Sequence, residues 1–187
     1  MQRGRTASRK QTKKKVTLTV NGKSYDLEIG DRPDQVKPWD TLAHTLRETL
    51  GLTGTKISCD HGACGGCTVI LDEKAVLSCM TLTAECDGLA VTTVEGLGDP
   101  KTGALDPLQQ AFIDHTAFQC GFCTPGVLMS AKALLRENPS PAEEEVKEAL
   151  SGNFCRCASH YQVVKAIMGA SGKGGGPRWA ESTDSAA

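Results

Sequence analysis

Residues 59–67, CDHGACGGC, hold three cysteines in the spacing C-x4-C-x2-C, and Cys79 follows twelve positions after Cys67. This is the plant-type spacing of a [2Fe–2S] site with a distal fourth ligand. Two irons bridged by two sulfides need four thiolates that converge from two sides. A nine-residue loop delivers three of them only if its backbone turns tightly, which Gly62, Gly65 and Gly66 permit because glycine lacks a Cβ. The spacing therefore predicts a [2Fe–2S] cluster bound by Cys59, Cys64, Cys67 and Cys79.

A second set of four cysteines occurs later in the chain, as Cys120-x2-Cys123 and Cys155-x-Cys157. Each pair stands just before a predicted helix, where free amides and the helix dipole favour anionic thiolates. A structural zinc site also takes four cysteines, although its pairs are usually spaced C-x2–4-C, so a one-residue spacing is tight for a tetrahedral ion. The spacing favours a second iron–sulfur cluster and leaves zinc as the alternative.

Two histidines near the cysteines offer a Rieske-like alternative, in which histidines replace two cysteines on one iron. The fragments Cys59-x-His61 and Cys157-x-x-His160 lie far apart, and this assignment leaves seven of the nine cysteines without a role. A loop histidine and a helix-start histidine are the simpler interpretation. The ninth cysteine, Cys86, has no partner in either set and is expected to be a buried, small apolar side chain.

Nine cysteines in 187 residues fit either a secreted disulfide scaffold or a cytosolic metal protein. Residues 1–15 contain seven basic side chains, no apolar run and no adjacent arginine pair, so we expect neither a secretory nor a twin-arginine signal. No stretch approaches the roughly 20 apolar residues of a membrane span. We therefore predict a cytoplasmic protein without membrane insertion, whose cysteines bind metal.

The charge is uneven, because the first 15 residues carry seven basic and no acidic side chains. Residues 1–15 are expected to form a disordered basic arm. The remainder has 14 basic and 22 acidic residues and no array of aromatic side chains, so we expect no nucleic-acid partner. Residues 169–187 are rich in glycine and are expected to be a flexible tail.

The chain between these ends divides into two predicted domains, 16–95 and 96–168, with a break in the glycine-rich stretch 95–104. In the first, alternating residues at 16–20 and 25–29 around Asn21-Gly22 predict a hairpin. Asp40 is the expected cap of a helix over 42–50 that stops at Gly51, and 68–71 and 89–94 are expected strands.

The second domain has helical periodicity throughout. Leu108, Ala111, Phe112 and His115 define one expected helical face, and Val127, Ala131, Leu134 and Leu135 define another. Ser140-Pro141-Ala142-Glu143 matches a capping box with proline at the first helical position, so a third helix is expected to begin there and end at Gly152. Apolar residues at 163, 164, 167 and 168 predict a fourth.

Three motifs in this order resemble the small iron–sulfur subunit of the xanthine oxidase family of molybdenum hydroxylases, which includes carbon-monoxide dehydrogenases and aldehyde oxidoreductases. They are residues 59–69 (CDHGACGGCTV), 119–126 (QCGFCTPG) and 152–157 (GNFCRC). The likeness covers about Val16–Met168 and implies an α+β fold. Its N-terminal part would be a β-grasp, plant-type ferredoxin-like domain, and its C-terminal part a four-helix [2Fe–2S]-binding domain.

The resemblance also implies partners. A large subunit would hold the molybdopterin cofactor, and a medium subunit, where present, would hold FAD. The second cysteine set would lie nearest the molybdenum, with Gln119 and Cys157 approaching the pterin, and the first set would face the flavin or another acceptor. Gly66 stands before Cys67 where Cys-Gly-Ala-Cys is commoner, a departure that changes no ligand but prevents assignment to one enzyme.

These expectations define an electron-transfer subunit of an oxidoreductase, in which substrate oxidation occurs at molybdenum on another chain. No pattern for a nucleophile, phosphate loop or paired-carboxylate site occurs in this sequence, so no residue is expected to be catalytic. Two alternatives remain. One is a free-standing two-cluster ferredoxin, for which the helical half would be superfluous. The other is a structural or regulatory protein with one cluster and one zinc, which metal analysis would identify.

Overall fold

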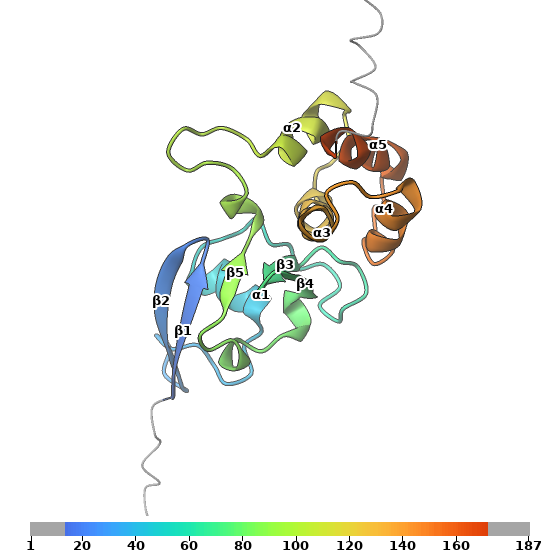
Figure 1. Cartoon of the computed structure of the whole chain (residues 1–187). Helices are drawn as coiled ribbons and strands as arrows, with labels where there is room; N and C mark the ends of the chain where they lie inside the picture. The colour runs from blue at the N-terminus through green and yellow to red at the C-terminus, as the bar shows by residue number, and fades with distance from the viewer. Residues whose placement is uncertain (1–13, 172–187) are drawn as a thin grey trace, which may run out of the picture.

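The computed structural model describes residues 14–171, which form a mixed five-stranded sheet followed by a group of helices (Figure 1). The strands lie in the order β2-β1-β5-β3-β4. One apolar core lies under the sheet and a second lies among the helices. The predicted α+β class is confirmed. Residues 1–13 and 172–187, which include most of the predicted basic arm and glycine-rich tail, lie outside the described residues.

Strands β1 (Lys14–Val20) and β2 (Lys23–Ile29) form the predicted antiparallel hairpin. Asn21 and Gly22 connect them with φ of 50° and 79°, the left-handed pair that a two-residue hairpin turn requires. Val16, Leu18 and Val20 are buried and Thr19 is exposed, which is the expected alternation. The hairpin starts earlier than expected, because the last two residues of the predicted basic arm belong to β1.

The remaining strands are β3 (Thr68–Leu71), β4 (Lys74–Leu77) and β5 (Ala90–Thr92). β5 pairs in parallel with β1 and antiparallel with β3, so it links the two hairpins into one sheet. It is shorter than the predicted strand at 89–94, because the chain turns into the 3-10 segment η4 (Val94–Gly96). β4 was not predicted; it pairs with β3 across Asp72 and Glu73, both at positive φ.

The first helix, α1 (Leu42–His44), continues directly into the π-helical turn η1 (Thr45–Thr49), covering the predicted range. The predicted cap was wrong: Thr41 is the N-cap, and its hydroxyl accepts from the His44 amide at 3.3 Å. The Asp40 carboxylate instead accepts from the Lys37 amide at 2.8 Å, which fixes the preceding loop. The chain then reverses at Gly51, with φ of 71°, as expected.

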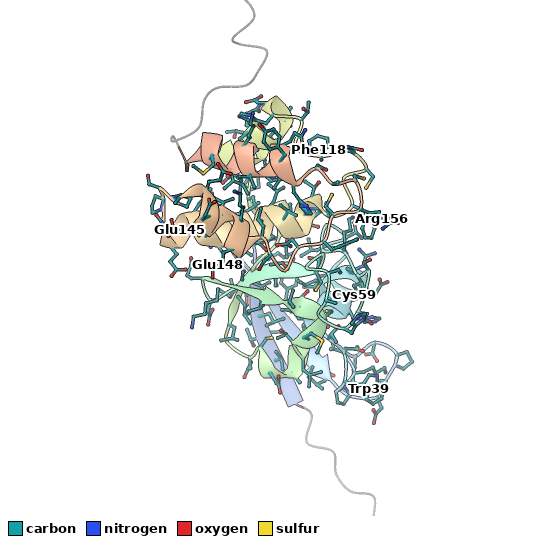
Figure 2. The ribbon with its side chains drawn as sticks, turned by 90° about the vertical axis from the view of Figure 1, so that its right-hand side faces the viewer. Trp39, Cys59, Phe118, Glu145, Glu148 and Arg156 are labelled. Carbon is teal, nitrogen blue, oxygen red and sulfur yellow. The ribbon has the colours of Figure 1, made fainter. Side chains whose placement is uncertain are left out.

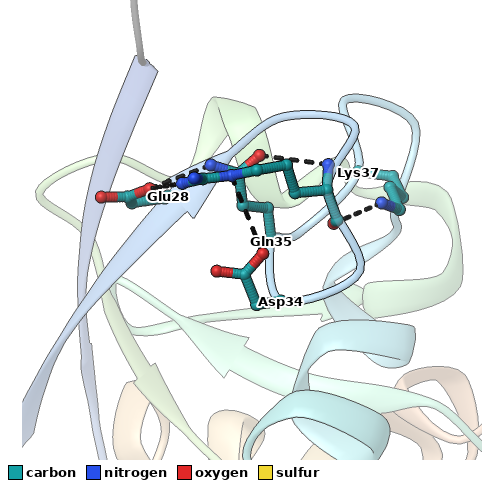
Figure 3. Close-up of polar contacts among 5 residues, drawn as sticks. Glu28, Asp34, Gln35 and Lys37 are labelled. Carbon is teal, nitrogen blue, oxygen red and sulfur yellow. Dashed lines mark hydrogen bonds and ion pairs between the residues drawn. The ribbon is translucent and has the colours of Figure 1, made fainter.

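Polar contacts hold the loop between β2 and α1 in place (Figure 3). Glu28 accepts from Arg32 at 3.0 Å and from the Gln35 amide group at 2.9 Å. The Lys37 ammonium donates to the Arg32 carbonyl at 2.6 Å. The loop presents Trp39, whose side chain is 67% exposed, on a fixed backbone.

The helical half contains the four predicted helices, α2 (Pro107–Asp114), α3 (Thr124–Glu137), α4 (Glu143–Ala149) and α5 (His160–Ala170). Their buried faces include Phe112, Val127, Val146 and Ile167. α2 ends one residue before His115, which is its C-cap. α5 extends to Ala170, two residues into the predicted tail.

The start of α4 corrects the capping-box prediction. The helix begins at Glu143 with Ala142 as N-cap, and neither Ser140 nor Pro141 belongs to it. The Glu145 carboxylate accepts from the Ala142 amide at 2.6 Å, so one of the two hydrogen bonds expected of a capping box forms, two residues later than predicted. The helix stops at Ala149, three residues before Gly152.

The two halves meet where α3 packs on β3 and β4 (Figure 1). Near the end of α3, Arg136 pairs with Glu73 of the β3–β4 turn at 3.1 Å. The N-terminal end of α3 reaches the loop of residues 59–67. No helix within residues 14–171 is long and apolar enough to cross a membrane.

Candidate metal centres

The first group of cysteines lies at the edge of the sheet domain. Cys59 and Cys64 lie in the loop before β3, Cys67 directly precedes β3, and Cys79 lies in the 3-10 turn η2 (Ser78–Met80) after β4. Because β3 and β4 are paired, Cys67 and Cys79 are brought together at one end of the hairpin. Their thiols hydrogen-bond to each other, and those of Cys59 and Cys64 do the same.

The backbone of this loop turns its amides toward the sulfurs. Asp60, Gly62 and Gly65 have φ of 55°, 79° and 69°, the left-handed region that glycine tolerates best. Amides of His61, Ala63 and Cys64 donate to the Cys59 sulfur, the Ala63 bond measuring 3.3 Å. The Gly62 amide donates to Cys79. Such amides stabilise negative charge on sulfur whether or not a metal is bound.

The two pairs differ in their protonation. Hydrogen bonds, first from the His61 amide and then from the Cys64 thiol, lower the pKa of Cys59 to about 6. Burial raises the pKa of Cys79 to about 11. The more exposed pair, Cys59 and Cys64, therefore offers a ready thiolate, whereas a metal bound at the inner pair must displace a proton.

The second group lies among the helices. Cys120 and Cys123 precede α3, and Cys155 and Cys157 precede α5, as predicted. The Cys157 thiol lies 3.5 Å from the Cys120 sulfur, and Cys123 hydrogen-bonds to Cys155. The first pair is the more exposed and the second the more buried. Gly121, at φ of 77°, permits the turn between the first two cysteines.

The thiols of this group also differ in pKa because their environments differ. Burial raises the pKa of Cys123 to about 12. Burial also opposes ionisation of Cys155, but hydrogen bonds from the hydroxyl and amide of Ser159 and from Cys123 outweigh it and lower its pKa to about 7. The Phe122 amide is the main cause of a lowered pKa at Cys120.

Each group therefore consists of two interacting pairs of cysteines. Within residues 14–171, no three His, Cys, Asp or Glu side chains surround a position suited to a single ion. A dinuclear cluster takes two thiolates on each iron, so two pairs per group fit it better than they fit tetrahedral zinc. The Thr124 hydroxyl, next to Cys123, is buried without a partner, and a sulfur acceptor nearby would satisfy it.

Gln119 lies beside the outer pair of the second group. It is exposed, and its side-chain amide donates to the Cys157 carbonyl at 3.3 Å. Figure 2 shows Cys59, Phe118 and Arg156 along one side of the molecule, and Glu145 and Glu148 of α4 toward the other. Four large exposed side chains flank the second group in sequence: Phe118, Phe122, Phe154 and Tyr161, which are 41–67% exposed.

The histidine rings and the ninth cysteine take no part in either group. The His61 ring hydrogen-bonds to the Cys59 carbonyl, and His160 is exposed at the start of α5, so the Rieske-like alternative finds no support. Cys86 is buried in the sheet core, where its thiol donates to the Leu82 carbonyl at 3.3 Å. Its predicted role as a buried apolar side chain is confirmed.

Three residues near the cysteines were not predicted to have a role of their own: Thr124, Gly126 and Asn153. All three fall within the quoted motifs, but only the fold shows what they contact. Asn153 is buried, and its amide donates to the Gly65 carbonyl at 3.2 Å. Gly126, in the first turn of α3, lies against the same carbonyl.

Comparison with known families matches both halves of the chain. The 2Fe-2S iron-sulfur cluster binding domain matches residues 27–91, and the [2Fe-2S] binding domain matches residues 93–168. The fold and the cysteine groups thus define a protein with two [2Fe–2S]-binding domains in series, a ferredoxin-like one followed by a helical one.

Full-length relatives narrow the class. The chain is 49% identical over 158 residues to the nicotine 6-hydroxylase small subunit of Paenarthrobacter nicotinovorans, covering 84% of this chain and 90% of that subunit. It resembles a chain of quinoline 2-oxidoreductase from Pseudomonas putida 86 with a TM-score of 0.76 and 42% identity, covering 84% and 91%. It also resembles aldehyde oxidoreductase from Desulfovibrio desulfuricans, with a TM-score of 0.77 and 43% identity, covering 86% of this chain but 17% of that longer one.

The chain belongs to the family of small iron–sulfur subunits of the xanthine oxidase-type molybdenum hydroxylases, as its three motifs predicted. It is a non-catalytic subunit of an oxidoreductase.

Proposed function

We propose that this chain relays electrons, one at a time, from a molybdopterin site on a large partner subunit to FAD or another acceptor. The observation that carries the proposal is the gathering of four cysteines in each half into two contacting pairs, with backbone amides directed at the sulfurs. When bound, two [2Fe–2S] clusters supply one-electron redox chemistry.

In this proposal the eight grouped cysteines are the ligands, one contacting pair to each iron. Cys59, Cys64, Cys67 and Cys79 hold the cluster of domain 16–95, and Cys120, Cys123, Cys155 and Cys157 hold that of domain 96–168. The long connection between η4 and α2 supports this division, as does the change of family match after residue 91. The paired geometry favours iron–sulfur over zinc in the second group.

The second group is the one we assign to the molybdenum side. Its outer pair is the more exposed, and exposed aromatic side chains of the kind that anchor interfaces flank it. Gln119 and Cys157 are joined by a hydrogen bond at this surface, which supports their assignment as the residues that approach the pterin. The first group then serves the acceptor, which a medium FAD subunit would hold.

The protein part of this relay is preorganisation. The amides of His61, Ala63 and Phe122 hold negative charge on sulfur without moving, so electron transfer requires little rearrangement.

Purification of the native complex tests the proposal. We expect four irons and no zinc per chain, two distinct paramagnetic signals after reduction, and a co-purifying molybdenum subunit. One zinc with two irons would end the two-cluster assignment. A chain that is isolated alone, stable and redox-active, with no molybdenum partner would instead identify a free-standing carrier.

A further inference from the structure

Gly126, in the first turn of α3 and three residues after Cys123, lies against the backbone of the first cysteine loop. A Cβ added there would lie 2.1 Å from the Gly65 carbonyl oxygen and 3.0 Å from both the Gly65 carbonyl carbon and the Gly66 Cα. All three atoms belong to the backbone of the first cysteine loop, so no side-chain rotation relieves the overlap. Non-bonded carbon contacts need about 3.5 Å or more, so α3 and this loop would have to separate by roughly 1 Å.

The same loop is also hydrogen-bonded to the segment that leads into Cys155. The Phe154 amide donates to the Cys64 carbonyl at 2.9 Å, and the Asn153 side chain donates to the Gly65 carbonyl at 3.2 Å. Asn153 is 7% exposed, so little water competes for this bond. One hydrogen bond and a few covalent bonds thus connect Cys64 of the first group with Cys155 of the second.

The Gly65 carbonyl is itself held from within its own domain. The Thr68 hydroxyl and amide donate to it at 2.7 Å and 3.2 Å. The carbonyl cannot turn away from α3 without losing these bonds, so the close contact requires glycine at position 126. The backbone of Gly126 has no positive φ, and steric space is the reason for the glycine.

We propose that Gly126 is a positioning residue that sets the separation of the two cysteine groups, and that the Phe154–Cys64 hydrogen bond is the bonded route between them. This inference rests on the proposed function. With both clusters bound, the step it governs would transfer one electron from the second cysteine group to the first, so that one cluster would be oxidised and the other reduced by that electron. No proton is transferred and no bond is made or broken, and the reductant would be the molybdenum centre of the partner.

The test is Gly126→Ala in the complete complex, with Gly152→Ala as matched control. Gly152 precedes Asn153, and its added Cβ would meet nothing within 4 Å. The readout is the splitting of the paramagnetic signals that arises from magnetic coupling between the two clusters after full reduction with dithionite. This splitting reports the distance between the clusters independently of turnover. We expect it to narrow in Gly126→Ala at unchanged iron content, and reduction of the first cluster by substrate to slow several-fold. The control should match the wild type.

Unchanged splitting in an iron-replete Gly126→Ala protein would overturn the inference. If that variant fails to retain iron, the same splitting is measured in Asn153→Ala. This variant removes the hydrogen bond from Asn153 to the Gly65 carbonyl without adding bulk. A narrowed splitting in Asn153→Ala supports the inference, and an unchanged one overturns it. Failure of the proposed function is distinguishable, because it would appear in the wild type as fewer than four irons or a single signal.

Discussion

The sulfur of Cys157 lies 3.5 Å from that of Cys120, although the two residues are 37 positions apart in the chain. The contact exists because the entry loops of α3 and α5 converge where these helices pack with α2 and α4. It forms at the surface of the helical half, whose buried core shares no residue with the buried core of the sheet. The two metal centres should therefore be separable by mutation.

Cys120→Ser tests that separation. We expect loss of the second cluster, so that iron falls from four to about two per chain, because a [2Fe–2S] cluster needs four good ligands. Electron flow from molybdenum to the acceptor should stop, while the first cluster keeps its paramagnetic signal. Iron analysis and spectroscopy of the reduced complex measure both effects. An equal loss of both signals would contradict independent centres.

The sequence predicted the parts of this protein that depend on local patterns. The two sets of cysteines, the β1–β2 hairpin and the four helices all follow from spacing, turn residues and periodicity. Asp40 was mistaken for the helix cap because aspartate is the more favourable capping residue of the two, whereas in the structure its carboxylate is taken up by the Lys37 amide and Thr41 caps the helix.

What the sequence could not predict depends on contacts between distant segments. The parallel pairing of β1 with β5 joins residues about 70 positions apart, and no local pattern encodes it. Gly126 is an ordinary helical glycine by sequence and by φ, and its role appears only once Gly65 is placed against it. The orphaned Thr124 hydroxyl likewise depends on burial that tertiary packing creates.

Gln119→Ala tests the contact with the molybdenum subunit. The variant loses the hydrogen bond to the Cys157 carbonyl but no cysteine, so four irons should remain. We expect turnover of the complex to fall several-fold, while reduction of the clusters by dithionite is unchanged. Gln110→Ala is the matched control, because Gln110 is on α2, where it hydrogen-bonds to Asp114. Equal turnover in the two variants would show that Gln119 has no role in electron transfer from the molybdenum subunit.

Asp106→Ala should be the most destabilising of the simple charge removals. Its carboxylate caps α2 by accepting from the Leu108 amide at 2.9 Å, and it pairs with Lys132 of α3 at 2.5 Å. The Asp106 side chain is only 9% exposed, so its removal leaves a half-buried lysine without its partner. We expect a loss of about 2 kcal/mol, measured as a fall in the thermal midpoint of roughly 4–8 °C at fixed scan rate.

The control for Asp106 is Glu73→Ala, which removes the partner of Arg136. The Glu73 side chain is 78% exposed, and surface ion pairs of this kind contribute about 0.2–1 kcal/mol. The thermal midpoint should move little, and the small shift should disappear in high salt. A larger loss in Glu73→Ala than in Asp106→Ala would mean that the junction between the halves, rather than the helical core, limits stability.

Cys86→Ala should retain all four irons, because Cys86 lies in the sheet core and contacts neither cysteine group. The small cavity should cost about 1 kcal/mol. Loss of either cluster in this variant would show that Cys86 is a cluster ligand and that the assignment of the eight ligands is wrong.

The pH dependence of stability tests whether the Cys86 thiol is buried as described. Burial, and then the neighbouring charges of Glu85 and Asp72, raise the pKa of Cys86 from 9.0 to about 11. The folded protein thus keeps a proton that the unfolded chain releases above pH 9.0. The stability due to the neutral thiol is fully present below pH 9.0 and is lost as the pH rises toward 11. Cys86→Ser does not titrate in this range, so its stability should fall less steeply than that of the wild type. Parallel curves of thermal midpoint against pH for the two proteins would mean that Cys86 ionises in the folded state as readily as in the unfolded one.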